Sequence, residues 1–75
     1  MNDIFYLGHY IKNIEGKEYF CIRVLDLKHF QIFTFYHTTD EKSKNIINSF
    51  KKFDNITDKL TYVIKRNNKI SFDLK

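Results

Sequence analysis

The sequence contains no proline, alanine or tryptophan, only two glycines and a single cysteine. One cysteine excludes a disulfide within the chain, so non-covalent packing has to hold the fold together. No segment approaches the roughly 18 apolar residues of a membrane-spanning helix. The start, Met1-Asn2-Asp3, lacks the basic residues and apolar run of a secretion signal. We therefore expect a cytoplasmic protein with no membrane partner, folded as a single domain over residues 1–75.

Aromatic side chains are abundant where small ones are missing. The chain has eight phenylalanines and five tyrosines among 75 residues, and isoleucine is also frequent. A chain of this length buries only about 60% of the surface that it exposes when unfolded, so each core residue has to bury a large area. Aromatic and β-branched side chains also fit a pleated sheet. The composition predicts a small, β-rich fold.

Three apolar runs open the chain. They predict strands over residues 4–12, 17–25 and 30–37. The intervening residues, 13–16 and 26–29, predict two four-residue hairpin connections, the first of which contains Gly16.

The spacing of the apolar residues then becomes helical. Ile46, Ile47, Phe50 and Phe53 stand at i, i+1, i+4 and i+7. Thr38 with Glu41 three residues later has the form of a capping box, which would begin a helix. We predict a helix over about 39–52, with its four apolar residues in the core.

Two further strands are predicted at 59–66 and 69–74, joined by a two-residue turn at Asn67-Asn68. The order β-β-β-α-β-β predicts an α+β domain in which a five-stranded, twisted antiparallel sheet packs one face on a single helix. This order resembles that of the OB-fold barrel family, which implies a small barrel. An open two-layer sheet fits the same order equally well.

The predicted register separates the tyrosines from the phenylalanines. With two four-residue connections, Tyr10 faces Tyr19, Tyr19 faces Tyr36 and Tyr6 faces Arg23. The last hairpin places Tyr62 on the polar side in the same way. The opposite, core-facing side is predicted to hold Phe5, Leu7, Phe20, Ile22, Val24, Phe33 and Phe35.

A face of this kind is suited to binding, because a tyrosine ring is apolar while its hydroxyl needs water or a polar partner. The leading prediction is a nucleic-acid-binding module for single strands, with bases stacked on tyrosine rings and phosphates held by cations. The predicted stacking residues are Tyr6, Tyr10, Tyr19, Tyr36 and Tyr62. The predicted phosphate contacts are Arg23, Lys65, Arg66 and Lys69. A split of the tyrosines between the two faces would remove the basis of this prediction.

Two alternatives remain open. The same tyrosines and arginine would suit a protein–protein interaction module, such as an adaptor or inhibitor of phage or other mobile-element origin, acting alone or as a homodimer. The face could also be an ordinary solvated sheet surface. The charge pattern does not decide between them: residues 1–41 carry four Lys/Arg against six Asp/Glu, and residues 42–75 carry nine against three.

The residues needed for catalysis are not arranged for it. Cys21 would need His9 or His37 as a base, but the predicted register gives it Gly8 and Thr34 as neighbours. The histidines and the cysteine lack the spacing of a zinc site, and there is no glycine-rich phosphate loop. We expect no enzyme activity, no cofactor and no metal.

Overall fold

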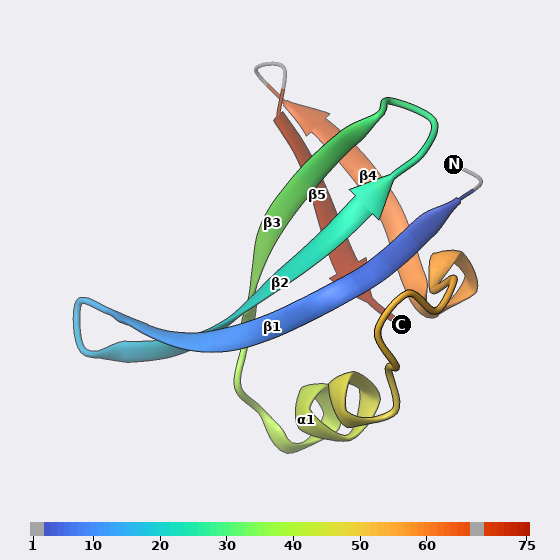
Figure 1. Ribbon diagram of the computed structural model, residues 1–75. Helices are drawn as coiled ribbons and strands as arrows, with labels where there is room; N and C mark the ends of the chain where they lie inside the picture. The colour runs from blue at the N-terminus through green and yellow to red at the C-terminus, as the bar shows by residue number, and fades with distance from the viewer. Residues whose placement is uncertain (1–2, 67–68) are drawn as a thin grey trace.

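The computed structural model describes the backbone of residues 3–66 and 69–75 and the side chains of residues 3–61 and 71–75. Its elements are the strands β1 (Ile4–Ile14), β2 (Lys17–Asp26) and β3 (Gln31–Thr38), the helix α1 (Glu41–Asn48), a 3₁₀ turn (Thr57–Lys59), and the strands β4 (Leu60–Arg66) and β5 (Lys69–Leu74). Figure 1 shows the strands in two groups, with the helix below them. The predicted order of strands and helix is confirmed, and antiparallel sheets with one helix are consistent with the α+β class.

The strands form two antiparallel sheets, β1-β2-β3 and β4-β5. The prediction of a single five-stranded sheet is therefore wrong, and the described strands do not close into a barrel. The Phe72 ring of β5 packs against Phe33 and Phe35 of β3, with ring centroids 6.1 and 5.5 Å apart. Side chains fill the space between the sheets at this point, so the sheets stack on each other instead of continuing one hydrogen-bonded ladder.

The first hairpin is longer and tighter than predicted. Its turn consists of Glu15 and Gly16 alone, with φ angles of 52° and 80°. Positive φ at both central residues is characteristic of a type I′ turn, whose twist matches that of the paired strands. The four-residue connection predicted at 13–16 is therefore wrong, because Asn13 and Ile14 belong to β1. Residues 9–18 are exposed on this hairpin, which extends as an arm beyond the core (Figure 1).

A β-bulge interrupts β1 between Tyr6 and Gly8. On one side of it Tyr6 pairs with Val24, and on the other side Tyr10 pairs with Cys21. The bulge inserts one residue into β1, and one extra residue exchanges the two faces of a strand. Gly8 permits the bulge because its φ of 133° is a conformation that residues with a Cβ rarely adopt.

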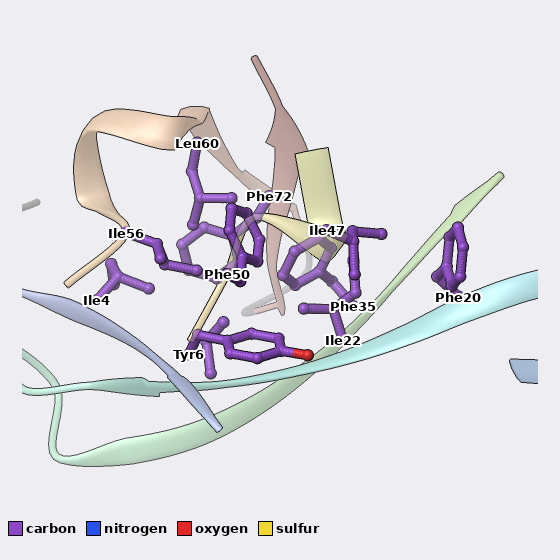
Figure 2. Packing of buried hydrophobic residues seen from close by; sticks show 11 residues of the cluster. Ile4, Tyr6, Phe20, Ile22, Phe35, Ile47, Phe50, Ile56, Leu60 and Phe72 are labelled. Carbon is purple, nitrogen blue, oxygen red and sulfur yellow. The ribbon is translucent and has the colours of Figure 1, made fainter. Parts of the chain in front are cut away.

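The core lies between the two sheets and the helix. Its described residues come from all five strands, from α1 and from the segment after it: Ile4, Tyr6, Phe20, Ile22, Val24, Phe35, Ile47, Phe50, Ile56, Leu60 and Phe72. Figure 2 shows the Tyr6 ring lying among them, near Phe50 and Ile22. The prediction that Phe20, Ile22, Val24, Phe33 and Phe35 share the core-facing side is confirmed.

Helix α1 is shorter than predicted. It begins after Asp40, whose carboxylate accepts a hydrogen bond from the Ser43 N–H at 2.8 Å, so Asp40 and not Thr38 is the N-cap. It ends at Asn48, although a helix to about 52 was expected. Ile47 and Phe50 are buried as predicted, whereas Phe53 is exposed with a φ of 69°. The left-handed conformation at Phe53 ends the turn that follows the helix.

The segment after the helix runs along the free side of β1. The Tyr6 N–H donates to the Asp54 carbonyl at 3.0 Å, and the Tyr6 carbonyl accepts from the Phe53 N–H at 2.7 Å. The Ile56 N–H donates to the Ile4 carbonyl at 2.8 Å. This segment therefore covers the first residues of the β1 edge. β3 forms the other edge of the sheet.

Candidate functional site

The candidate site is the side of the β1-β2-β3 sheet that faces away from the core, here called the outer face. Residues paired across antiparallel strands share a face, and faces alternate along each strand. Because Phe20, Ile22 and Val24 of β2 are in the core, Tyr19, Cys21, Arg23 and Leu25 lie on the outer face. Their partners complete it: Phe5, Gly8, Tyr10, Lys12, Ile14 and Lys17 in the first hairpin, and Ile32, Thr34, Tyr36 and Thr38 in β3.

Three of the predicted stacking tyrosines lie on this face. Tyr10 and Tyr36 flank Cys21 in one row across the sheet and are 49% and 51% exposed. Tyr19 is in the next row, between Lys12 and Thr38, and is partly buried. The expected contacts of Tyr19 with Tyr10 and Tyr36 are wrong, since both hairpins pair two residues further along than predicted. A shift of two residues changes the partners but keeps every side chain on its face.

Tyr6 does not belong to this face. It pairs with Val24 on the core side and is only 7% exposed. Its ring packs edge-on against Phe50, and its hydroxyl forms a hydrogen bond with His9 Nδ1. Burial raises the pKa of the Tyr6 phenol above its usual value. The prediction that the tyrosines share one face is therefore wrong for Tyr6, and the β-bulge is the reason.

Because of the same bulge, the predicted core positions of two apolar residues are also wrong. Phe5 pairs with Leu25 on the outer face, not in the core, and Leu7 lies within the bulge. Both are partly buried. Sequence alone gave no signal for the bulge apart from Gly8, which stands in the middle of an apolar run.

Four predicted residues have side chains outside the described part of the chain: Tyr62, Lys65, Arg66 and Lys69. Their backbones belong to β4 and β5, where Arg66 pairs with Lys69 and Lys65 with Ile70, as predicted. The register shifts between Thr61 and Ile64, so Asp73 faces Thr61 and not Tyr62. The turn at Asn67-Asn68 lies outside the described residues.

The charges on the outer face have one sign. Its cations are Lys12, Lys17 and Arg23, and no aspartate or glutamate stands at any outer-face position of β1, β2 or β3. Lys17 Nζ lies 5.5 Å from the centre of the Tyr19 ring, a cation–π distance. Arg23 is exposed and lies beside Thr34. The outer face is thus both aromatic and cationic.

The acidic residues of the same half of the chain lie elsewhere. Asp3 precedes β1, Glu15 is in the turn and Glu18 is on the core side of the arm. Asp26 is buried beneath the β2–β3 connection, where it accepts hydrogen bonds from the Lys28 N–H and from His29 at 2.9 and 2.6 Å. Asp40 and Glu41 begin the helix. Residues 1–41 are acidic in sum, yet the outer face formed from them is basic.

Cys21 and two of the three histidines, His9 and His37, are on opposite faces of the sheet. Cys21 is buried in the outer row between Tyr10 and Tyr36, while His9 and His37 pair with Ile22 and Phe20 on the core side. His37 Nδ1 lies 2.9 Å from the Ser43 hydroxyl, which ties β3 to α1. Within the described residues, no three His, Cys, Asp or Glu side chains are grouped as metal ligands would be.

A second exposed feature adjoins the outer face at the β2–β3 connection. Leu27, Phe30 and Ile32 are all exposed, and Phe30 is the most exposed of them at 86%. Phe30 also has a φ of 50°. A bulky residue in this conformation is uncommon, and its exposure means that core packing does not compensate for the strain. Phe30 and Ile32 were both predicted to lie in a strand and neither was predicted to bind a partner, but Phe30 precedes β3.

Comparison of the chain with protein-family models, with curated proteins and with solved structures finds no match to any of them. Among the helices that the structure describes, none is long and apolar enough to cross a membrane.

Proposed function

We propose that the protein binds single-stranded nucleic acid on the outer face of the β1-β2-β3 sheet. The observation that carries this proposal is the combination of exposed tyrosines with cations and no carboxylate on that face. The tyrosines are split between the two faces, because Tyr6 is in the core, so the five-tyrosine basis of the sequence prediction is lost. The proposal rests instead on the tyrosines that remain on the outer face and on the cations beside them, and it does not need a closed OB-like barrel.

Each part of the face has a role in such binding. Exposed Tyr10 and Tyr36 offer flat surfaces on which bases stack without regard to sequence, and stacking contributes about 1–3 kcal/mol per base. Open sheets that bind single-stranded RNA use aromatic side chains in this way for two or three bases. Lys12, Lys17 and Arg23 would neutralise phosphates, and the absence of carboxylates avoids repulsion. Lys65, Arg66 and Lys69 stay in the proposal as candidates on the second sheet.

The test is a titration of fluorescently labelled single-stranded and duplex oligonucleotides at two salt concentrations. We expect preference for single strands and weaker binding at higher salt. Tyr36→Ser should weaken binding by about 1–3 kcal/mol, whereas Phe53→Ser, which removes an exposed ring elsewhere, should not. Arg23→Gln should weaken binding more than Lys44→Gln on the helix. No binding at low salt, or equal effects of the paired variants, would overturn the proposal.

A protein partner is the second candidate function, favoured by exposed Leu27, Phe30 and Ile32 beside the outer face. Buried aromatic anchors supply much of the binding energy in protein interfaces. An adaptor or inhibitor using this surface would retain a specific protein on the immobilised chain and lose it in Phe30→Ser. Retention that Phe30→Ser leaves unchanged would argue against this candidate.

A further inference from the structure

The strand β3 is an unprotected edge. It is the last strand of its sheet, and among the described residues no backbone hydrogen bond joins its free edge to another segment. The contacts of β3 with Ser43 of α1 and Phe72 of β5 are made by side chains on its core-facing side. Proteins usually protect such edges with charges, proline or bulges. The eight residues of β3, QIFTFYHT, contain none of these. The opposite edge is different, since residues 53–56 cover the start of β1 and a bulge follows.

The direction of the backbone groups of β3 can be derived from the pairing. The backbone N–H and carbonyl of Tyr6 form hydrogen bonds with the segment after the helix and therefore point away from β2. Val24, which pairs with Tyr6, must then point its own backbone N–H and carbonyl toward Phe33 of β3. The next residue, Thr34, must then point its N–H and carbonyl away from the sheet. Ile32 and Tyr36 do the same, because the direction alternates along the strand.

The side chains of β3 are arranged symmetrically about Thr34. Phe33 and Phe35 stand on either side of it, then Ile32 and Tyr36, then Gln31 and His37. In a two-fold symmetric pair, the surface has to be complementary to itself. An antiparallel pair of two β3 strands centred on Thr34 places Ile32 opposite Tyr36 of the second copy and each Thr34 opposite the other. Aromatic and β-branched residues are a favourable cross-strand pair.

The large apolar side chains that would meet in this pair are exposed in the single chain. Ile32 and Tyr36 are 56% and 51% exposed, and Phe30, which precedes the strand, would lie opposite Thr38 of the second copy. Three of the exposed large apolar side chains thus fall within residues 30–38, on the strand whose backbone groups are free to pair.

We infer that the protein forms a homodimer by antiparallel pairing of β3 with β3 of a second copy, centred on Thr34. The six strands then form one continuous sheet, and the outer faces of the two copies lie side by side. The dimer does not rest on the proposed nucleic-acid binding, although Tyr36 takes part in both, and it is tested without any oligonucleotide.

The first test is the molar mass in solution by sedimentation equilibrium as a function of protein concentration. The wild type should approach twice the mass of one chain. Ile32→Lys should reduce this to the mass of one chain, because the substitution removes the apolar contact with Tyr36 of the second copy and a lysine on an edge strand opposes pairing with another strand. Ile11→Lys is the matched control, since Ile11 is equally exposed, at 56%, on the other edge of the sheet, and it should remain dimeric. Circular dichroism of each variant checks that the fold is retained.

The second test addresses the register. Thr34→Lys alone should be monomeric, because two lysines would stand directly opposite each other beside Arg23 of each copy. An equimolar mixture of Thr34→Lys and Thr34→Glu should restore the dimer mass. A monomeric wild type at every concentration, equal effects of Ile32→Lys and Ile11→Lys, or no recovery in the mixture would overturn the inference.

Discussion

The two faces of the β1-β2-β3 sheet are built from alternate residues of the same strands, yet they differ in every property that matters for binding. On the core side, Phe20, Ile22 and Val24 are at most 4% exposed. On the outer side, Tyr10 and Tyr36 are about half exposed, and the charged neighbours are cations. Phenylalanine has no polar atom to satisfy and suits a dry core, whereas tyrosine keeps its hydroxyl in water. The comparison separates the residues that hold the fold from those available to a ligand.

The β-bulge shows that this separation depends on the backbone and not on residue type alone. Tyr6 and Tyr10 belong to one strand, four residues apart, and without the bulge they would share a face. Because of the extra residue, the Tyr6 side chain points into the core, where its ring packs on Phe50 and its hydroxyl forms a hydrogen bond with His9. A tyrosine therefore serves stability on one side of the bulge and remains available for binding on the other.

The largest expected effect contrasts Ile22 with Tyr36. Ile22 is fully buried, so Ile22→Ala should lower the free energy of unfolding by about 2–5 kcal/mol through lost burial and the cavity left behind. Tyr36→Ala should cost about 1 kcal/mol or less, because substitutions of exposed residues change stability little. Urea denaturation measures both. Similar losses for the two variants would contradict the division of the faces.

The next effect concerns the bulge itself. Gly8 has a φ of 133° and no heavy atom within 4 Å of where a Cβ would stand, so Gly8→Ala tests backbone conformation without steric conflict. We expect a loss of about 1–3 kcal/mol in the free energy of unfolding, the usual cost of a residue held in a sparsely populated conformation. An unchanged denaturation midpoint would show that the bulge does not require glycine.

A smaller difference in the free energy of unfolding is expected between variants that remove one of two tyrosine hydroxyls from β1. Tyr6→Phe removes the hydrogen bond to His9 and should cost about 1 kcal/mol of stability. Tyr10→Phe should leave the free energy of unfolding unchanged, because the Tyr10 hydroxyl is on the exposed outer face. Equal midpoints for the two variants in urea would place both hydroxyls in equivalent surroundings and contradict the bulge.

The smallest effect concerns the helix that covers the core side. Hydrogen bonds from the Thr38 hydroxyl and the Ser43 N–H lower the pKa of Asp40 to about 2. A carboxylate with a lowered pKa stabilises the folded state above its unfolded pKa, and this contribution disappears as the pH falls through the folded pKa. The stability difference between wild type and Asp40→Asn should therefore be constant near neutral pH and shrink between about pH 4 and 2. A difference that does not vary with pH in urea titrations would contradict this assignment.

Much of the fold followed from the sequence, because apolar periodicity reports elements well. The order of strands and helix was predicted from the spacing of apolar residues, and the core positions Ile22, Val24 and Phe35 from alternation within the strands. The β1-β2 and β2-β3 hairpins pair two residues further along than expected. The predicted face of each side chain was still correct outside the bulge, because a shift of two residues preserves alternation. The single inserted residue near Gly8 could not be inferred from alternation, and it moved Tyr6 from one face to the other.

The division into two sheets was not predictable in the same way. Alternation describes one strand at a time and does not state which strand neighbours which. The packing of Phe72 on Phe33 and Phe35 depends on how the β4-β5 hairpin lies against the β1-β2-β3 sheet. The helix end was also missed, because Phe53 continues the apolar spacing but adopts a left-handed conformation outside the helix.

The most direct test of the account follows the tyrosine rings themselves. In protein labelled with ¹³C-tyrosine, with signals assigned by Tyr→Phe variants, a single-stranded oligonucleotide is added and the ring resonances are recorded. We expect large changes for Tyr10, Tyr19 and Tyr36 on the outer face and little change for Tyr6 in the core. Unchanged outer-face signals, or changes at Tyr6 as large as those at Tyr36, would contradict it.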